Sequence, residues 1–133
     1  MEEVIERIKQ KLLENIDCEA IVLFGSYSRG TQNLESDIDI AFKTNQTISK
    51  KEIFYLKQEL EDVANKDIDL IDLDNIGDAF RYEILINGKT LYSKDELSFE
   101  LYKLDMYREF LELNESRMSI IERIKKGDTI YGK

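Results

Sequence analysis

Histidine, proline and tryptophan are absent from this sequence of 133 residues, and cysteine occurs once, at Cys18. Without histidine the chain cannot perform Ser-His or Cys-His nucleophilic catalysis, and it lacks the commonest ligand of transition metals. A single cysteine excludes an internal disulfide and a cysteine-based zinc cluster. Carboxylates must therefore carry any chemistry that the protein performs.

Long apolar runs and an excess of basic residues are also missing. No run approaches the roughly 18 apolar residues that a membrane span needs, and the acidic, amphipathic start is unlike a signal peptide. The 28 acidic residues outnumber the 19 basic ones, for a net charge of -9, whereas general nucleic-acid binders cluster Lys and Arg. We expect a cytoplasmic, single-domain protein over residues 1–133 with no direct nucleic-acid or membrane binding. A nucleotide held through a metal, or a basic protein partner, is compatible with this charge.

The stretch from Ala20 to Phe42 carries the strongest functional signal. Five apolar residues end at Gly25, which predicts a buried strand that stops at a sharp turn. Gly25 lets the backbone approach a ligand closely, and the amides after Ser26 can point at an anion. This turn therefore has the chemistry of a phosphate-binding site, although a Gly-Ser pair alone is more often an ordinary turn.

An acidic strand follows, predicted over residues 37–42. Alternation places Asp37 and Asp39 on one face and Ile38 and Ile40 on the other. Two like charges on one strand face repel, so the arrangement favours a divalent cation between them, because Mg²⁺ binds carboxylate and phosphate oxygens together. A solvated strand edge is the plainer reading of an isolated Asp-x-Asp.

The remaining elements predict an α/β (α+β) fold with a small mixed sheet flanked by helices. Further strands are expected over residues 67–73 and 89–92. Apolar spacing predicts helices over residues 2–15, 49–64 and 76–86, with Ser49 as a cap, Asp74 or Asn75 starting the third and Asn87-Gly88 ending it in a left-handed turn. Ser93 is expected to cap a long helical region over about 94–127, with a break near Asn114. We place the catalytic core at about 1–92.

The long helical region carries an apolar stripe that either packs inside the protein or receives a partner. Arg81 and Glu83 could approach a nucleotide, but a surface ion pair is the expected role of both residues. The stripe consists of Leu97, Leu101, Leu104, Tyr107, Leu111, Met118, Ile121 and Ile124.

The combination of strand, Gly-Ser turn, ten residues and Ser36-Asp-x-Asp resembles the DNA polymerase beta-like nucleotidyltransferase superfamily. The segment Ile68 to Leu73 carries a further acid, and the resemblance implies that Asp69 is the third site carboxylate, with Asp67 as the alternative. The resemblance also implies that Gly25, Ser26, Arg29 and Ser36 bind the nucleotide. The other reading is that the acids of this third strand only discourage edge-to-edge aggregation.

The whole chain is similar to the minimal nucleotidyltransferase (MNT-domain, MntA-type) antitoxins. The residues that carry this resemblance are GSYSRG at 25–30, SDID at 36–39, IDLIDL at 68–73 and RYEILINGKTLY at 81–92. The family implies transfer of AMP from ATP, with two Mg²⁺ ions at Asp37, Asp39 and Asp69, to a tyrosine of a cognate HEPN RNase toxin. Two alternatives remain: an antitoxin that only covers the toxin, and a nucleotidyltransferase acting on a small molecule such as an aminoglycoside.

Overall fold

The computed structural model describes residues 2–25, 30 and 37–125, with side chains as far as residue 112. Its centre is a four-stranded sheet in the order β3-β2-β1-β4. The strands are β1 (Cys18–Phe24), β2 (Ile38–Thr44), β3 (Ile68–Asp72) and β4 (Lys89–Ser93). β1 is antiparallel to β2 and β4, and β2 is parallel to β3. The expected mixed sheet is confirmed, with strand ends that differ from the prediction by one or two residues.

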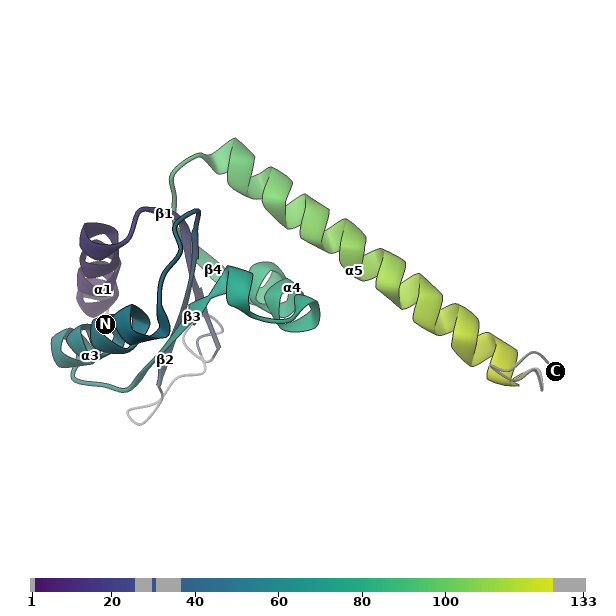
Figure 1. Cartoon of the computed structure of the whole chain (residues 1–133), viewed down its shortest axis with the longest axis horizontal. Coiled ribbons are helices and arrows are strands. Elements are labelled where there is room, and N and C mark those ends of the chain that lie inside the picture. Colours follow the sequence, from purple (N-terminus) through teal and green to yellow (C-terminus); the bar gives the residue numbers. More distant parts are fainter. Residues whose placement is uncertain (1, 26–29, 31–36, 126–133) are drawn as a thin grey trace.

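Helices cover both faces of this sheet (Figure 1). α1 (Glu2–Asn15) and α3 (Lys50–Ala64) lie on one face, and α4 (Asp78–Asn87) and the start of α5 (Glu96–Lys125) lie on the other. A short 3-10 helix, η1 (Leu73–Asn75), connects β3 to α4. Within the residues described, none of these helices combines the length and apolar character that crossing a membrane requires.

Strand alternation divides the core into two layers. Ile38, Ile40 and Phe42 of β2 are fully buried against α1 and α3. Ala41, one position out of phase, is buried on the α4 and α5 side. Because side chains alternate between faces, Asp39 shares the α4 and α5 side with Ala41. The sequence of β2 thus fixes which side of the sheet carries the acids.

The helix caps agree only partly with the sequence. Ser49 caps α3 as predicted, since its Oγ accepts a hydrogen bond from the Glu52 amide at 3.1 Å. The predicted cap at Ser93 is wrong: Ser93 ends β4, and the Asp95 carboxylate accepts from the amides of Leu97 and Ser98 at 3.1 and 3.3 Å. An aspartate accepts the same bonds as a serine, so the sequence offered two candidates two residues apart.

The predicted start of α4 is wrong, whereas its predicted end at Asn87-Gly88 is confirmed in position but not in conformation. Neither Asp74 nor Asn75 caps this helix, because both belong to η1, and Gly77 is the cap without a side-chain bond. Gly88 has a φ of -79°, so the expected left-handed turn does not form. α5 continues through Asn114 without the expected break, and the predicted stop at Gly127 lies outside the described residues.

Gly88 is required by packing. A Cβ built on it would lie 2.5 Å from the Ile84 carbonyl oxygen and 2.5 Å from Val22 Cγ1. Both neighbours belong to packed elements, since Ile84 is in α4 and Val22 is in the buried strand β1. The absence of a side chain at Gly88 therefore lets the end of α4 approach the sheet.

We predict that Gly88→Ala lowers the free energy of unfolding by about 1–3 kcal/mol, because backbone and core atoms must move to admit the methyl group. Gly77→Ala is the matched control: in the described part of the chain no atom lies within 4 Å of its built Cβ, and replacing glycine by alanine at a helix N-cap should cost only about 0.5–1 kcal/mol. Chemical denaturation of both variants is the measurement. Equal costs would contradict the packing role of Gly88.

Candidate active site

Three side chains form a row across the sheet. In the strand register Phe24 of β1 is opposite Asp39 of β2, and Asp39 is opposite Asp69 of β3. Directly paired residues project from the same face, which here is the α4 and α5 side. Asp39 is half-buried and Asp69 is exposed. The structure therefore brings two predicted site acids side by side, and we call Asp39 and Asp69 the acid row.

Asp37 and Asp67 lie at the same end of β2 and β3. Asp37 directly precedes β2 and is exposed, and Asp67 directly precedes β3. The Ile38 amide donates a hydrogen bond to the Asp67 carbonyl oxygen at 3.0 Å, which ties the two strand starts together. Asp69, not Asp67, is the register partner of Asp39, so the geometry favours the predicted third acid over its alternative.

Gly25 makes room for the Asp39 carboxylate. Its φ is +70°, a left-handed conformation that favours glycine, and a Cβ at this position would collide with Asp39 Oδ2. The predicted close approach at Gly25 therefore involves a site carboxylate of the chain itself. The other predicted nucleotide-binding residues, Ser26, Arg29 and Ser36, lie outside the described residues.

An aromatic pair borders the acid row, and sequence reasoning did not identify it. Phe24 packs edge-on against Phe80 of α4, with ring centroids 6.1 Å apart and an interplanar angle of 80°. Phe80 remains 42% exposed. The available signal was the position of Phe24 directly before Gly25, but the contribution of Phe80 depends on the docking of α4. The site thus has charged and apolar parts side by side.

Two other polar residues near this region have structural roles. Arg81 donates from Nε to the Leu73 carbonyl at 2.8 Å and from a terminal nitrogen to the Ile76 carbonyl at 3.0 Å, and it pairs with Asp78 at 3.6 Å. Arg81 thus forms an ion pair as expected, but its side chain is only 15% exposed and so does not lie at the surface. Asp72 is buried and accepts from the Asp74 amide at 3.0 Å. Both side chains hold η1 and α4 in place.

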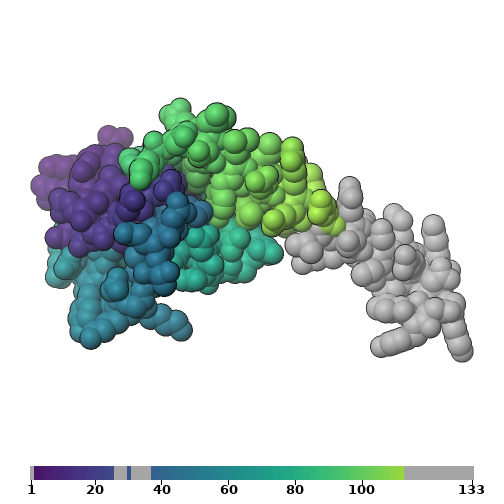
Figure 2. Space-filling model, turned by 45° about the horizontal axis from the view of Figure 1, so that its top comes forward, coloured from purple at the N-terminus to yellow at the C-terminus, as the bar shows by residue number. Residues whose placement is uncertain are grey.

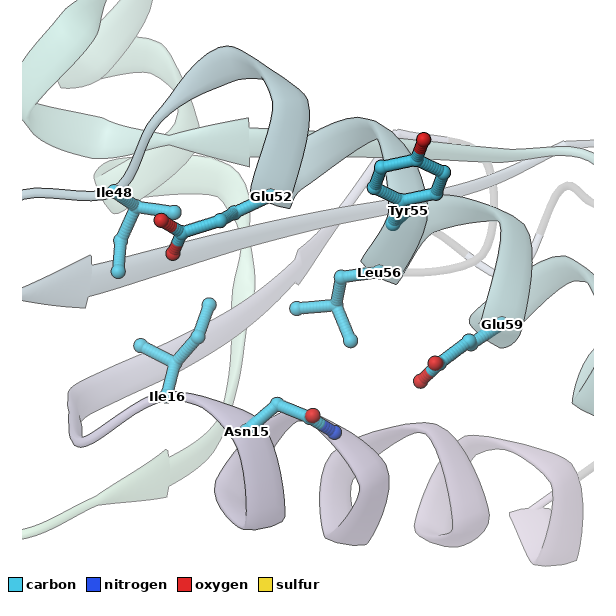
Figure 3. A pocket seen from close by; sticks show the side chains of 7 residues that line it. All are labelled: Asn15, Ile16, Ile48, Glu52, Tyr55, Leu56 and Glu59. Atoms are coloured by element: carbon cyan, nitrogen blue, oxygen red, sulfur yellow. The ribbon is translucent and has the colours of Figure 1, made fainter.

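A separate pocket lies between α1 and α3 (Figure 3). It is on the far side of the sheet from the acid row. Two carboxylates, from Glu52 and Glu59, are part of its lining together with Asn15, Ile16, Ile48, Tyr55 and Leu56. No glycine turn is part of this lining, whereas the Gly25 turn directly adjoins the Asp39 carboxylate. The acid row is therefore the better candidate for nucleotide chemistry.

Comparison with known proteins supports this choice. The family described as "Polymerase beta, Nucleotidyltransferase" matches residues 6–97, a range that contains the Gly25 turn and the acid row. The chain belongs to the polymerase beta nucleotidyltransferase family. The predicted superfamily and its fold are confirmed.

One curated relative covers most of both chains. It is the protein adenylyltransferase MntA of Shewanella oneidensis, which is 34% identical over 121 residues, or 89% of this chain and 85% of the relative.

Two solved structures of toxin-antitoxin proteins are also similar to this chain over most of its length. A toxin-antitoxin crystal structure with AMP-PNP has a TM-score of 0.78 and 31% identity, covering 90% of this chain and 97% of its own. A tri-AMPylated Shewanella oneidensis HEPN toxin in complex with its MNT antitoxin gives a TM-score of 0.75 and 27% identity over 93% and 98% of the two chains. The likeness thus extends beyond the family's shared region.

We predict that Gly25→Ala reduces nucleotidyl transfer by at least about 100-fold, because the new methyl group displaces the Asp39 carboxylate and misplaced catalytic groups are that costly. The free energy of unfolding should fall by only about 1–2 kcal/mol, the cost of a left-handed non-glycine residue, since a carboxylate can swing aside.

Gly30→Ala controls for the backbone effect. Gly30 has the same φ of +70°, but among the described residues no atom lies within 4 Å of its built Cβ. This variant should lose a similar free energy of unfolding and much less transfer activity. If both variants lose activity equally, the contact between Gly25 and Asp39 has no functional role.

Proposed function

We propose that this protein is a Mg²⁺-dependent protein adenylyltransferase that acts as a cytoplasmic antitoxin. It would transfer AMP from ATP to a tyrosine of a cognate HEPN RNase toxin. The observation that carries the proposal is the acid row, where Asp39 and Asp69 are adjacent beside the Gly25 turn. Likeness to an adenylyltransferase and to toxin-bound antitoxins over about nine-tenths of the chain supports the choice of acceptor.

The acids fit a magnesium site by their chemistry. Asp37, Asp39 and Asp69 offer only carboxylate oxygens, the ligands that Mg²⁺ prefers. In the described part of the chain no three acidic side chains are grouped closely enough to enclose an ion by themselves. Mg²⁺ is commonly held by one or two carboxylates together with substrate phosphates, and two ions would fit this pattern. When bound, they would neutralise charge on the triphosphate.

The chain's own residues would act by positioning. The Gly25 turn, with Ser26, Arg29 and Ser36, would hold the triphosphate so that its α-phosphorus faces the acid row. The acceptor oxygen then bonds to the α-phosphorus while the bond to the leaving diphosphate breaks. Asp69, exposed on the neighbouring strand, is the residue we assign to accept the hydroxyl proton.

The aromatic pair suits a flat substrate group. Phe24 is the register partner of Asp39, and Phe80 leaves part of its ring open beside Phe24. A tyrosine or adenine ring could pack on this apolar surface while its polar atoms face the carboxylates. The site therefore offers support for an aromatic group next to the reacting atoms.

We predict that Asp39→Asn abolishes AMP transfer to the toxin, because the neutral amide lacks the negative charge with which a carboxylate binds Mg²⁺. Its free energy of unfolding should be unchanged or slightly higher, since one of two adjacent like charges is removed. Transfer of label from α-labelled ATP to purified toxin, together with thermal unfolding, tests both expectations. A variant that still transfers AMP would remove Asp39 from the mechanism, and full neutralisation without transfer would favour an antitoxin that only covers the toxin.

Asp69→Asn and Asp67→Asn distinguish the two candidates for the third acid. We expect Asp69→Asn to lose at least about 100-fold in transfer rate, the size typical of removing a general base, while Asp67→Asn loses less than about tenfold. The comparison is matched because both residues are exposed aspartates two positions apart. The reverse order would assign the role to Asp67 and contradict the register argument.

A further inference from the structure

Four leucines on α5 form an exposed strip. Leu97 is 69% exposed, and the others, Leu101, Leu104 and Leu111, are 52%, 43% and 42% exposed. We call these four residues the leucine stripe. The outer side of α5 is open in the space-filling view, where this part of the helix lies along α4 (Figure 2). The reading of these positions as internal core is therefore wrong.

A different side of α5 attaches the helix to the protein. Phe99 is buried with Val22 and Leu85, and Tyr102 and Met106 pack against the same cluster. Further along, Phe110 stacks on Tyr82 of α4 with ring centroids 3.7 Å apart. The fold thus anchors α5 without the leucine stripe, which leaves the stripe available for a partner.

The spacing of the leucine stripe specifies the shape of that partner. Its members follow one another at intervals of four, three and seven residues, which is the repeat of 3.5 that packs one helix against another. A strand or an irregular loop would not match an apolar seam of this period. The stripe fits an amphipathic helix laid along α5.

The lengths over which this chain matches its family and the solved antitoxins indicate which protein supplies the partner helix. The nucleotidyltransferase family match ends at residue 97, the second residue of α5. The solved antitoxin that is bound to an AMPylated HEPN toxin covers 93% of this chain, so most of the 30-residue α5 has a counterpart there. α5 is thus outside the region shared with the wider enzyme family and inside the region shared with toxin-bound antitoxins.

We infer that the leucine stripe of α5 is the surface on which the cognate HEPN toxin docks through one of its own helices. This inference rests on the proposed function and adds the location of the partner. α5 and α4 cover the same face of the sheet that carries Asp39 and Asp69. A toxin seated on α5 is therefore on the side of the sheet where an acceptor must enter.

The test is a binding measurement with Leu101→Asp/Leu104→Asp. Two buried charges in an apolar seam should weaken binding to the cognate HEPN toxin by at least about 100-fold. The matched control is Phe54→Asp/Tyr55→Asp on α3, where both aromatic side chains are 54% exposed on the opposite side of the sheet. The control should bind as tightly as wild type, and thermal unfolding of both variants should be near that of wild type.

Measuring the same affinities in an Asp39→Asn background separates docking from catalysis. If the leucine-stripe variant binds the toxin weakly but the wild-type chain transfers no AMP to it, the docking surface is supported and the proposed function is overturned. Undiminished binding of the stripe variant would overturn the docking surface whether or not AMP is transferred. A wild-type dimer that the stripe variant converts to monomer, with toxin binding intact, would assign the stripe to self-association and also overturn the inference.

A labelling experiment gives a readout without added charges. The native Cys18 is 1% exposed, and its burial, with Asp17 and Glu19 nearby, raises the pKa of the thiol to about 12, so it reacts slowly. In Leu101→Cys the introduced thiol is the reactive one. Toxin should slow its reaction with maleimide by at least about tenfold, whereas an unchanged rate in the complex would contradict docking on the stripe.

Discussion

The pairing of β1 with β2 and of β2 with β3 is the constraint on which the site depends. This register places Phe24, Asp39 and Asp69 in one row. Burial of Ile38, Ile40 and Phe42 fixes the register, because a slip by one residue would turn these large side chains toward α4 and α5 and would turn Asp39 into the core beneath α1 and α3. The apolar core on one face thus holds two like charges together on the other. Such an arrangement costs stability in the protein alone and is useful when a cation and a triphosphate are bound.

Two glycines and several aromatic contacts position α4 and α5 next to the site that the strand register forms. Gly25 leaves space at the Asp39 carboxylate, and Gly88 lets α4 approach β1, which brings Phe80 to Phe24. Arg81 then fixes η1 to α4 through two backbone carbonyls. The same α4 supports α5 through the stack of Tyr82 on Phe110. The proposed catalytic face and the proposed docking helix therefore belong to one packed layer, so a partner bound to α5 would be held at a fixed position relative to the acids.

The sequence predicted the features of the fold that depend on the periodicity of single strands and helices. Alternation in β2 and the periodicity of α1 and α3 correctly indicated the core and the face of Asp39, because burial imposes those periods. The sequence did not identify the correct helix cap where several polar or small residues are close together. Asp95, not Ser93, caps α5. Gly77, not Asp74 or Asn75, caps α4. The partnership of Phe24 with Phe80 and the exposure of the leucine stripe depend on tertiary packing, for which the sequence contains no local signal. The family resemblance already favoured Asp69 over Asp67 as the third acid, and the strand register supports that proposal.

The most direct measurement is the intact mass of the HEPN protein produced together with this chain. The account predicts a mass increase in whole AMP units when the chain is wild type, mapping to tyrosine, and an unmodified protein when either Asp39 or Asp69 is changed to asparagine. An unmodified toxin that is nevertheless silenced by the wild-type chain would contradict adenylyl transfer and would leave the acid row without its proposed function.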